Sequence, residues 1–258
     1  PRCRGRNLPL AEGLTRDLFP HRILPMTKNI LIAGGTSGIG AETLNMLRED
    51  GHEVYCACRS PEKLPEDPHV HGMVFDAADP SKALALPETL DGFVYFPGTI
   101  TLKPFGRLTA DDFLHDLQVN FLGAVGLLQR ALPSLLKGTD AAAVFFSTVA
   151  VQTGLPFHAS ISAAKGAVEG LTRSLAAELA PRIRVNCIAP SLTDTTLAAS
   201  LVSSDEKKAS SAKRHPLNRI GDPKEIAGLV QFLLGTQSLF MTGNIIKADG
   251  GLSSVKLF

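Results

Sequence analysis

The residues best suited to do chemistry come early in the chain, in a loop at 34–40 with the sequence GGTSGIG. In this GxxxGxG spacing, Gly34 permits a tight turn, Gly38 lets the backbone approach a pyrophosphate, and Gly40 lets a helix pack closely on a strand. An apolar run precedes the loop and a helical pattern follows it, so unpaired N–H groups at the helix start would face the anion. The residues predicted to form this dinucleotide site are Gly34, Thr36, Ser37, Gly38, Ile39 and Gly40.

The next residues with a chemical role follow the second apolar run, where the sequence is Cys58-Arg59-Ser60. Sites for NAD(H) usually place a carboxylate at this point to hold the ribose hydroxyls. A carboxylate would repel the 2′-phosphate of NADP(H), whereas a guanidinium pairs with it through two hydrogen bonds. With Arg59 and Ser60 here, the sequence favours NADP(H) as the cofactor; a solvated surface arginine is the alternative.

Strands and helices alternate along the chain and must position these residues. The expected strands are 29–33, 53–58, 72–75, 92–96, 142–147, 183–188 and 244–247. The expected helices are 38–50, 109–136, 160–179 and 223–234. Strands that are apolar throughout and separated by helices imply a parallel sheet covered on both faces. We therefore expect a single doubly wound α/β domain over 26–258, a Rossmann sheet of about seven strands whose carboxyl ends carry the ligand site.

Composition narrows the classes of partner. The chain has 258 residues, 44% of them apolar, and a net charge of +1, which argues against a nucleic-acid surface. No apolar run approaches the roughly 18–20 residues that a transmembrane helix needs, so we expect no membrane partner. The four cysteines include no CxxC pair, so we expect buried thiols rather than a metal site, and a reducing, cytoplasmic setting.

Residues 1–25 differ from the rest of the chain. They contain five Arg, no Lys, two acids and four Pro without a clear period, and a strand pattern begins just after Met26. We expect an N-terminal extension that is not part of the fold; an Arg-rich organelle transit segment is the alternative. A secretory signal is not expected, because these residues hold no apolar stretch of roughly 7–15 residues.

Several separate stretches resemble the short-chain dehydrogenase/reductase family, in particular its classical 3-oxoacyl-carrier-protein-reductase-like members. The stretches that carry the resemblance are 33–40, 75–77, 119–120, 184–190, 216–227, 242–243 and 249–251. The PGxxxT segment of the family keeps Pro190 and Thr195 but has Ser191 in place of glycine. The family's NNAG motif is replaced by Tyr95-Phe96-Pro97-Gly98, which keeps only the glycine. The resemblance extends from about residue 27 to residue 252.

The resemblance implies roles in binding the cofactor. Asp76 and the backbone of Ala77 would bind the adenine, and Gly98 would belong to the cofactor site. Lys165 would bind the hydroxyls of the nicotinamide ribose, and Asn120 would hold a water molecule toward it. Thr195 and the backbone of Leu192 would meet the nicotinamide amide, and Pro190 would belong to the cofactor site.

The catalytic positions of the family match poorly. Its active site contains Asn, Ser, Tyr and Lys, the last two spaced as YxxxK, and the residue four before Lys165 is Ile161. The usual serine position, thirteen residues earlier, holds Thr148. In the family the Tyr gives a proton to the oxygen that gains charge during hydride transfer, and the Ser hydroxyl binds that oxygen. Ile161 has no proton to give, and loss of a general acid costs roughly 10²–10⁴ in rate.

The retained and missing residues leave three hypotheses open. The first is an NADP(H)-dependent oxidoreductase acting on a carbonyl or alcohol, in which Thr148 polarises the carbonyl and Lys165, a bound water or His158 supplies the proton. The second is a non-catalytic or nearly inactive family member that binds the dinucleotide as a sensor or structural partner. The third is isomerase or dehydratase chemistry without net redox, with Lys165 or His158 acting on the substrate.

Substrate recognition is expected from segment 196–215, whose Ser-, Ala- and Lys-rich composition suggests a mobile lid over the pocket. Its cations either meet an anionic substrate carrier or form a solvated face; they are Lys207, Lys208, Lys213 and Arg214, with His215 beside them. We expect a small-molecule substrate, and the resemblance implies a homodimer or homotetramer.

Overall fold

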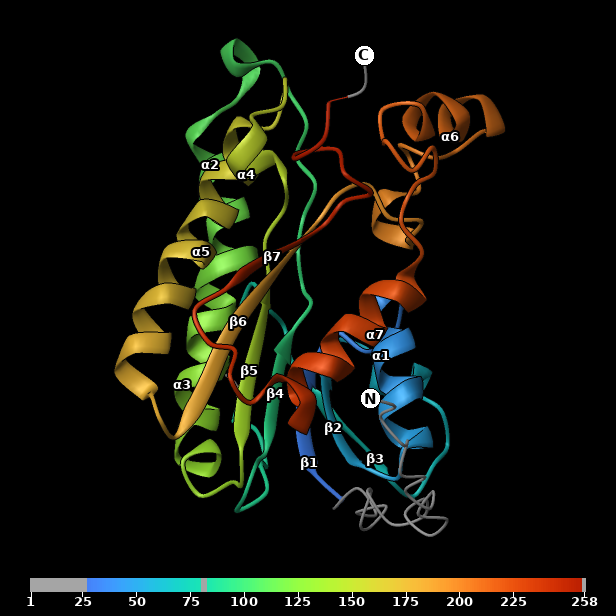
Figure 1. Ribbon diagram of the computed structural model, residues 1–258. Helices are drawn as coiled ribbons and strands as arrows, with labels where there is room; N and C mark the ends of the chain where they lie inside the picture. The colour runs from blue at the N-terminus through green and yellow to red at the C-terminus, as the bar shows by residue number, and fades with distance from the viewer. Residues whose placement is uncertain (1–26, 80–82, 257–258) are drawn as a thin grey trace, which may run out of the picture.

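The sheet of the protein is parallel and has seven strands in the order β3-β2-β1-β4-β5-β6-β7 (Figure 1). The computed structural model describes residues 27–79 and 83–256, so the predicted extension 1–25 lies outside the described residues. The strands are β1 (Asn29–Ala33), β2 (Glu53–Cys58), β3 (Val70–Val74), β4 (Gly92–Tyr95), β5 (Ala141–Phe146), β6 (Ile183–Pro190) and β7 (Ile245–Ala248). The chain runs outward from β1 in one direction and then outward from β4 in the other. The doubly wound α/β fold expected from the sequence is therefore confirmed.

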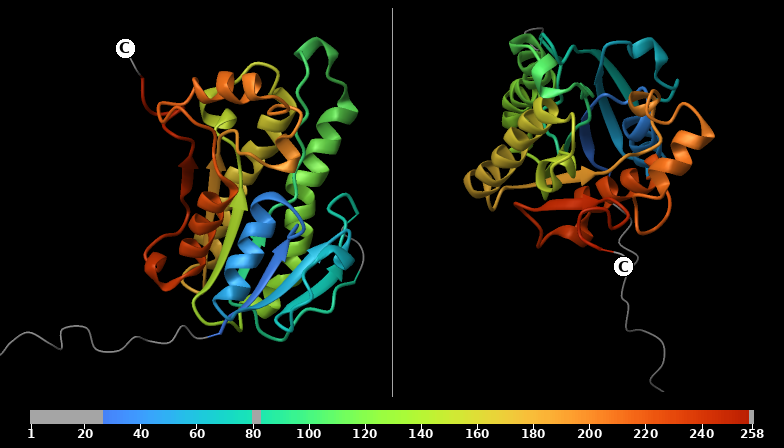
Figure 2. Two further views of the ribbon diagram at one scale, coloured as in Figure 1. Left: turned by 90° about the vertical axis from the view of Figure 1, so that its right-hand side faces the viewer. Right: turned by 90° about the horizontal axis from the view of Figure 1, so that it is seen from above.

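Helices cover both faces of this sheet. The α-helices of the described residues are α1 (Gly38–Glu49), α2 (Ala110–Leu117), α3 (Gly123–Leu135), α4 (Ala150–Thr153), α5 (Ala159–Leu179), α6 (Asp205–Ala212) and α7 (Pro223–Leu234). Helices α1 and α7 pack together on one face, while α3 and α5 cover the other (Figures 1 and 2). None of the helices within residues 27–79 and 83–256 is long and apolar enough to cross a membrane.

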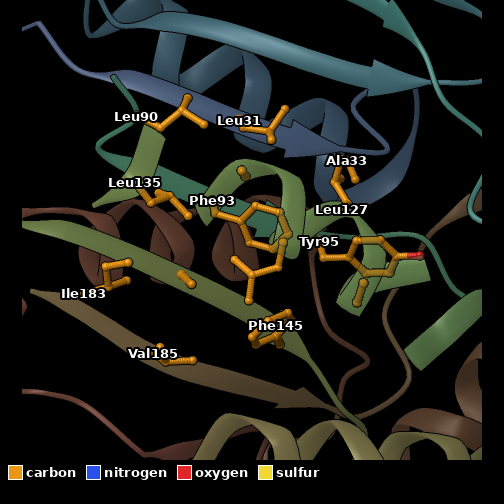
Figure 3. Packing of buried hydrophobic residues seen from close by; sticks show 14 of the residues in the cluster. Leu31, Ala33, Leu90, Phe93, Tyr95, Leu127, Leu135, Phe145, Ile183 and Val185 are labelled. Carbon is orange, nitrogen blue, oxygen red and sulfur yellow. The ribbon is translucent and has the colours of Figure 1, made fainter. Parts of the chain in front are cut away.

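Alternate residues of β1 point into two separate cores. Ile30 and Ile32 pack with residues of α1 and α7, whereas Leu31 packs with residues of α3 and α5. In the second core Phe93 and Phe145 meet edge to face, with ring centroids 5.8 Å apart (Figure 3). Both faces of the sheet are thus buried, as expected of a parallel sheet, and the surface left for ligands lies at the strand ends.

The helix predicted over 109–136 is interrupted in the structure. A π-helical turn at Gln118–Leu122 separates α2 from α3. Within this turn, Asn120 Nδ2 donates to the carbonyl oxygen of Asp116 at 2.8 Å, which is the acceptor that an α-helix reserves for the Asn120 backbone N–H. Competition from the side chain accounts for the wider turn.

Helix α6 was not expected from the sequence. It falls within the segment predicted to be a lid, and Ser204 caps it by accepting the Lys207 backbone N–H. Its sequence, DEKKASSA, contains no apolar stripe, so hydrophobic periodicity gave no signal there. The short helix α4 was missed as well, because four residues cannot display a period.

Candidate active site

A cavity of about 1000 Å³ opens at the carboxyl ends of the strands, where the segments that follow β1, β2, β4, β5 and β6 meet. The residues predicted from the sequence that line it are Gly34, Thr36, Ser37, Gly38, Ile39, Gly40, Arg59, Ser60, Asp76, Ala77, Gly98, Thr148, His158, Lys165, Pro190, Leu192 and Thr195. The structure thus brings every predicted site residue except Asn120 to the lining of one cavity. A cavity of this volume suits a cofactor together with a small substrate.

The glycine loop has a backbone that favours glycine. Gly34 and Gly38 have φ angles of +83° and +55°, in the left-handed region. A Cβ on Gly40 would lie 2.0 Å from the Gly34 carbonyl oxygen, so a side chain there would displace the loop. Ser37 precedes α1 without making a side-chain cap, which leaves the first N–H groups of the helix for a ligand. The loop therefore fits a pyrophosphate.

Two cations line the wall beyond the end of β2. Arg59 is exposed, and Lys63 follows it on the 3₁₀ turn Pro61–Lys63. Sequence analysis missed Lys63, because its position depends on how the chain folds back after Ser60, whose carbonyl accepts the Lys63 N–H at 3.1 Å. A phosphate in this part of the cavity would meet two positive charges.

Lys165 is the buried cation of the cavity, 8% exposed on α5. Burial lowers the pKa of its ammonium group to about 8, and the negative charge of Asp116 opposes that shift. Gly98 packs beside it, since a Cβ on Gly98 would lie 3.6 Å from Lys165 Nζ. Ile161, one helical turn earlier and 5% exposed, gives the same wall an apolar surface with neither a proton nor a dipole to offer.

Asn120 is the predicted site residue that does not line the cavity. Its Nδ2 donates to Thr99 Oγ1 at 2.7 Å and to the Asp116 carbonyl oxygen at 2.8 Å. Its Oδ1 accepts the Thr99 backbone N–H at 3.3 Å and lies close to Gly98, whose Cβ would be 3.0 Å away. Asn120 therefore holds the turn after β4 from behind Gly98. The water-holding role expected from the sequence stays a prediction.

A buried carboxylate that sequence analysis missed lies next to this turn. Asp116 is 0% exposed and accepts hydrogen bonds from the hydroxyls of Thr99, Thr101 and Ser160, the second at 2.9 Å. These donors offset the cost of burying the charge. They come from residues 15 to 44 positions away in the sequence, so no local spacing could reveal the cluster.

Two neighbouring hydroxyls at the end of β5 have different surroundings. Ser147 is buried and donates to the buried Glu169 carboxylate at 2.7 Å. Thr148 lines the cavity, and its Oγ1 accepts the Ala150 backbone N–H at 3.3 Å. Thr148 Oγ1 is the acceptor in this bond, so the hydrogen of the Thr148 hydroxyl can be donated to a substrate oxygen.

His158 precedes α5 and also lines the cavity. Its Nδ1 lies 2.7 Å from the Pro156 carbonyl oxygen, which can only accept. Nδ1 therefore carries a hydrogen, and Nε2 is the atom that could exchange a proton with a ligand.

Comparison of the sequence with known proteins gives matches over most of the chain. The family model described as enoyl-(acyl carrier protein) reductase matches residues 33–253. A tropinone reductase homolog of Datura stramonium is 34% identical over 241 residues, which cover 86% of this chain and 90% of that protein.

Solved structures give the same result. A short-chain dehydrogenase/reductase of Brucella melitensis, a glucose/ribitol dehydrogenase, superposes with a TM-score of 0.80 at 25% identity and covers 88% of this chain and 97% of its own. ElxO with NADP bound superposes with a TM-score of 0.78 at 25% identity, covering 89% of this chain and 100% of its own. From the glycine loop to the last strand, the chain belongs to the short-chain dehydrogenase/reductase family.

Proposed function

We propose that this protein is an NADP(H)-dependent oxidoreductase that interconverts a small carbonyl compound and its alcohol, with a proton source other than tyrosine. The observation that carries the proposal is the single cavity that joins the glycine loop and Arg59 to Thr148 and Lys165. The glycine loop and Arg59 offer an anchor for the dinucleotide phosphates, and Thr148 and Lys165 offer polar groups for a substrate oxygen.

The residues present fit NADP(H). The start of α1 would hold the pyrophosphate, and Arg59 with Lys63 would hold the 2′-phosphate. The relative ElxO, which has been solved with NADP, supports this choice of cofactor. By the family resemblance, Asp76 would contact the adenine and Lys165 the ribose hydroxyls. Thr195 and the backbone of Leu192 would meet the nicotinamide amide. When bound, the cofactor would supply or accept the hydride.

The substrate oxygen would be held by this chain's own polar groups. The Thr148 hydroxyl would donate to the oxygen as its negative charge grows. By the family spacing Ile161 stands where a tyrosine would give the proton, so another group must do so. Lys165 is a candidate, because a pKa of about 8 leaves most of its ammonium charged at pH 7. His158 Nε2 and a bound water are the other candidates from the sequence.

Two titrations followed by a single-turnover assay test the proposal. NADPH should bind more tightly than NADH when each is followed by its fluorescence. Reduced cofactor mixed with excess protein and a panel of ketones and aldehydes should then lose its absorbance at a rate above the protein-free control. Tighter binding of NADH would overturn the choice of cofactor, and cofactor binding without turnover of any carbonyl would overturn the redox reaction.

The apolar Ile161 favours a second candidate, a family member that binds the nucleotide as a sensor or structural partner. An Ile161→Tyr variant discriminates between the two, because it supplies the missing phenol next to Lys165. Turnover that appears only in the variant would support the second candidate. Measurable turnover in the unmodified protein would support the first.

We further propose that 196–215 acts as a lid, since Leu197 and Leu201 from this segment line the cavity. Limited proteolysis with and without NADPH tests it: closure should slow cleavage within 196–215, and equal cleavage would contradict it. Assembly as a homodimer or homotetramer stays a prediction from the family resemblance.

A further inference from the structure

The cavity wall also holds a serine–histidine pair that has no role in the proposed function so far. Ser191 follows β6 and His215 follows α6, and Ser191 Oγ lies 2.9 Å from His215 Nε2. Both residues line the cavity, and His215 is only 4% exposed. The pair therefore connects the end of the sheet to the segment that carries α6.

The hydrogen bonds of His215 define which ring nitrogen carries a hydrogen and which can exchange one. Nδ1 lies 2.9 Å from the carbonyl oxygen of Ser211, which can only accept, so Nδ1 carries a hydrogen. In the neutral ring, Nε2 then accepts from the Ser191 hydroxyl. In the protonated ring, Nε2 donates to Ser191 Oγ and leaves the serine proton for a ligand. This is an acid–base group held in position by a third partner.

Ser191 is linked through the backbone to the segment that carries Thr148, the residue expected to hold the substrate oxygen. The Val149 backbone N–H donates to the Pro190 carbonyl oxygen at 3.2 Å. Thr148 comes directly before Val149, and Ser191 comes directly after Pro190. Both residues line the cavity. One backbone hydrogen bond thus connects the segment after β5, which carries Thr148, to the end of β6, which Ser191 follows.

His215 is better placed for proton transfer than His158. Both ring nitrogens of His215 have partners, one of them a hydroxyl on the cavity wall. Gly250 of the C-terminal segment packs near the ring, since a Cβ on Gly250 would lie 3.6 Å from His215 Cδ2. Arg214 directly precedes His215 and its Nη2 donates to Ser211 Oγ at 3.0 Å, while Asp249 precedes Gly250 and its Oδ1 accepts the Gly251 N–H.

We propose that Ser191 and His215 form the acid–base couple that protonates the substrate oxygen during carbonyl reduction, in place of the absent phenol. This inference rests on the proposed function and names its proton source. As the oxygen gains charge, the Ser191 Oγ–H bond breaks and an O–H bond forms on the substrate. The proton on His215 Nε2 moves to Ser191 Oγ, and the ring is left neutral with its remaining hydrogen on Nδ1.

This step conserves both protons and electrons. One proton leaves the couple and one reaches the substrate, and water later returns a proton to His215. No electrons change hands within the couple, because the reduction itself uses the hydride that NADPH would supply under the proposed function. In the direction of alcohol oxidation, the same couple accepts the proton.

The first test is a nuclear magnetic resonance titration of the protein labelled with ¹⁵N-histidine, without cofactor. Neutral His215 should be the Nδ1–H tautomer, and Ser191→Gly should shift its Nε2 resonance while leaving those of the other histidines in place. His71 lies on the edge strand β3, where its Nε2 contacts Glu53. The His71→Gln variant lacks the His71 signal and so assigns one control resonance. A neutral Nε2–H tautomer, or no response to Ser191→Gly, would overturn the inference.

The second test is single-turnover NADPH oxidation with a carbonyl substrate that the wild type reduces. Ser191→Gly and His215→Gln should each lower the rate by roughly 10²-fold or more, with unchanged NADPH affinity. The rate in the wild type should fall over the pH range in which the labelled His215 loses its proton. Ser174→Ala, at an exposed position of α5, and His71→Gln, on the edge strand β3, should keep the wild-type rate. If His215→Gln fails to fold, Ser191→Gly carries the test.

The outcomes separate the inference from the proposed function. Turnover within two-fold of wild type in both variants would overturn the couple and leave the oxidoreductase standing. A wild type that binds NADPH but reduces no carbonyl would overturn the oxidoreductase, and with it the catalytic use of the couple, whatever tautomer His215 adopts.

Discussion

Asn120 and Thr99 hydrogen-bond each other twice: Asn120 Nδ2 donates to Thr99 Oγ1 at 2.7 Å, and the Thr99 backbone N–H donates to Asn120 Oδ1 at 3.3 Å. The pair fixes the turn that carries Gly98, which packs against Lys165 Nζ. The Thr99 hydroxyl donates onward to Asp116. A chain of hydrogen bonds thus connects a buried carboxylate to the backbone beside the buried ammonium.

Replacing Asp116 tests the importance of this buried carboxylate for stability. Asp116→Leu should lower the free energy of unfolding by at least about 2 kcal/mol, because three hydroxyls lose their acceptor. Asp116→Asn should cost less, since it keeps an acceptor oxygen. Urea denaturation followed by circular dichroism measures both. Asp111→Asn, at an exposed position of the same helix, is the matched control and should cost no more than about 1 kcal/mol. Wild-type stability in Asp116→Leu would contradict the cluster's role.

A side chain at Gly40 should destroy the phosphate site. In Gly40→Ala the Cβ would meet the Gly34 carbonyl oxygen at 2.0 Å, so the loop must move away from the pyrophosphate position. The Kd for NADPH should rise roughly 100-fold or more, equivalent to about 3 kcal/mol. Calorimetric titration measures it. Gly170→Ala on α5 is the control: its Cβ would meet nothing within 4 Å, so binding should be unchanged.

The lowered pKa of Lys165 predicts how stability depends on pH. Between pH 8 and 10.5 the unfolded chain holds the Lys165 proton while the folded chain has released it. The Lys165 contribution to the free energy of unfolding should therefore increase with pH across this range. Lys165→Met should remove that contribution, so the difference between wild type and variant should change with pH. Urea midpoints at pH 7, 9 and 10 measure it, and a constant difference would show an ordinary lysine.

The two cations near the end of β2 should select the phosphorylated cofactor. Arg59→Ala should weaken NADPH binding by roughly 10- to 100-fold, the loss of one charge-assisted pair, with little change for NADH. Lys63→Ala should act in the same direction with a smaller effect. Fluorescence titration with both cofactors measures the ratio. Arg107→Ala, on an exposed 3₁₀ turn, should leave the ratio unchanged. An equal loss for both cofactors in Arg59→Ala would place Arg59 elsewhere than on the 2′-phosphate.

Much of the fold was predictable because it depends on local patterns. The bounds of β1 and β2 agree with the sequence prediction, since an apolar run that ends at a glycine or at a change to polar residues marks a buried parallel strand. The glycine loop was predictable for the same reason, because its function depends on one turn and one helix end. Bounds shifted by one or two residues where strands such as β3 end without a turn signal.

The sequence by itself determined the doubly wound sheet, the glycine loop and the set of residues at the strand ends. Only the tertiary structure decided how polar groups far apart in the chain are paired. Asp116 accepts from three hydroxyls on two segments, the loop after β4 and the start of α5, and Ser191 meets His215 24 residues later. Periodicity and turn chemistry act over a few residues, whereas these contacts exist only once α2, α5 and the segment after α6 have packed against the strand ends.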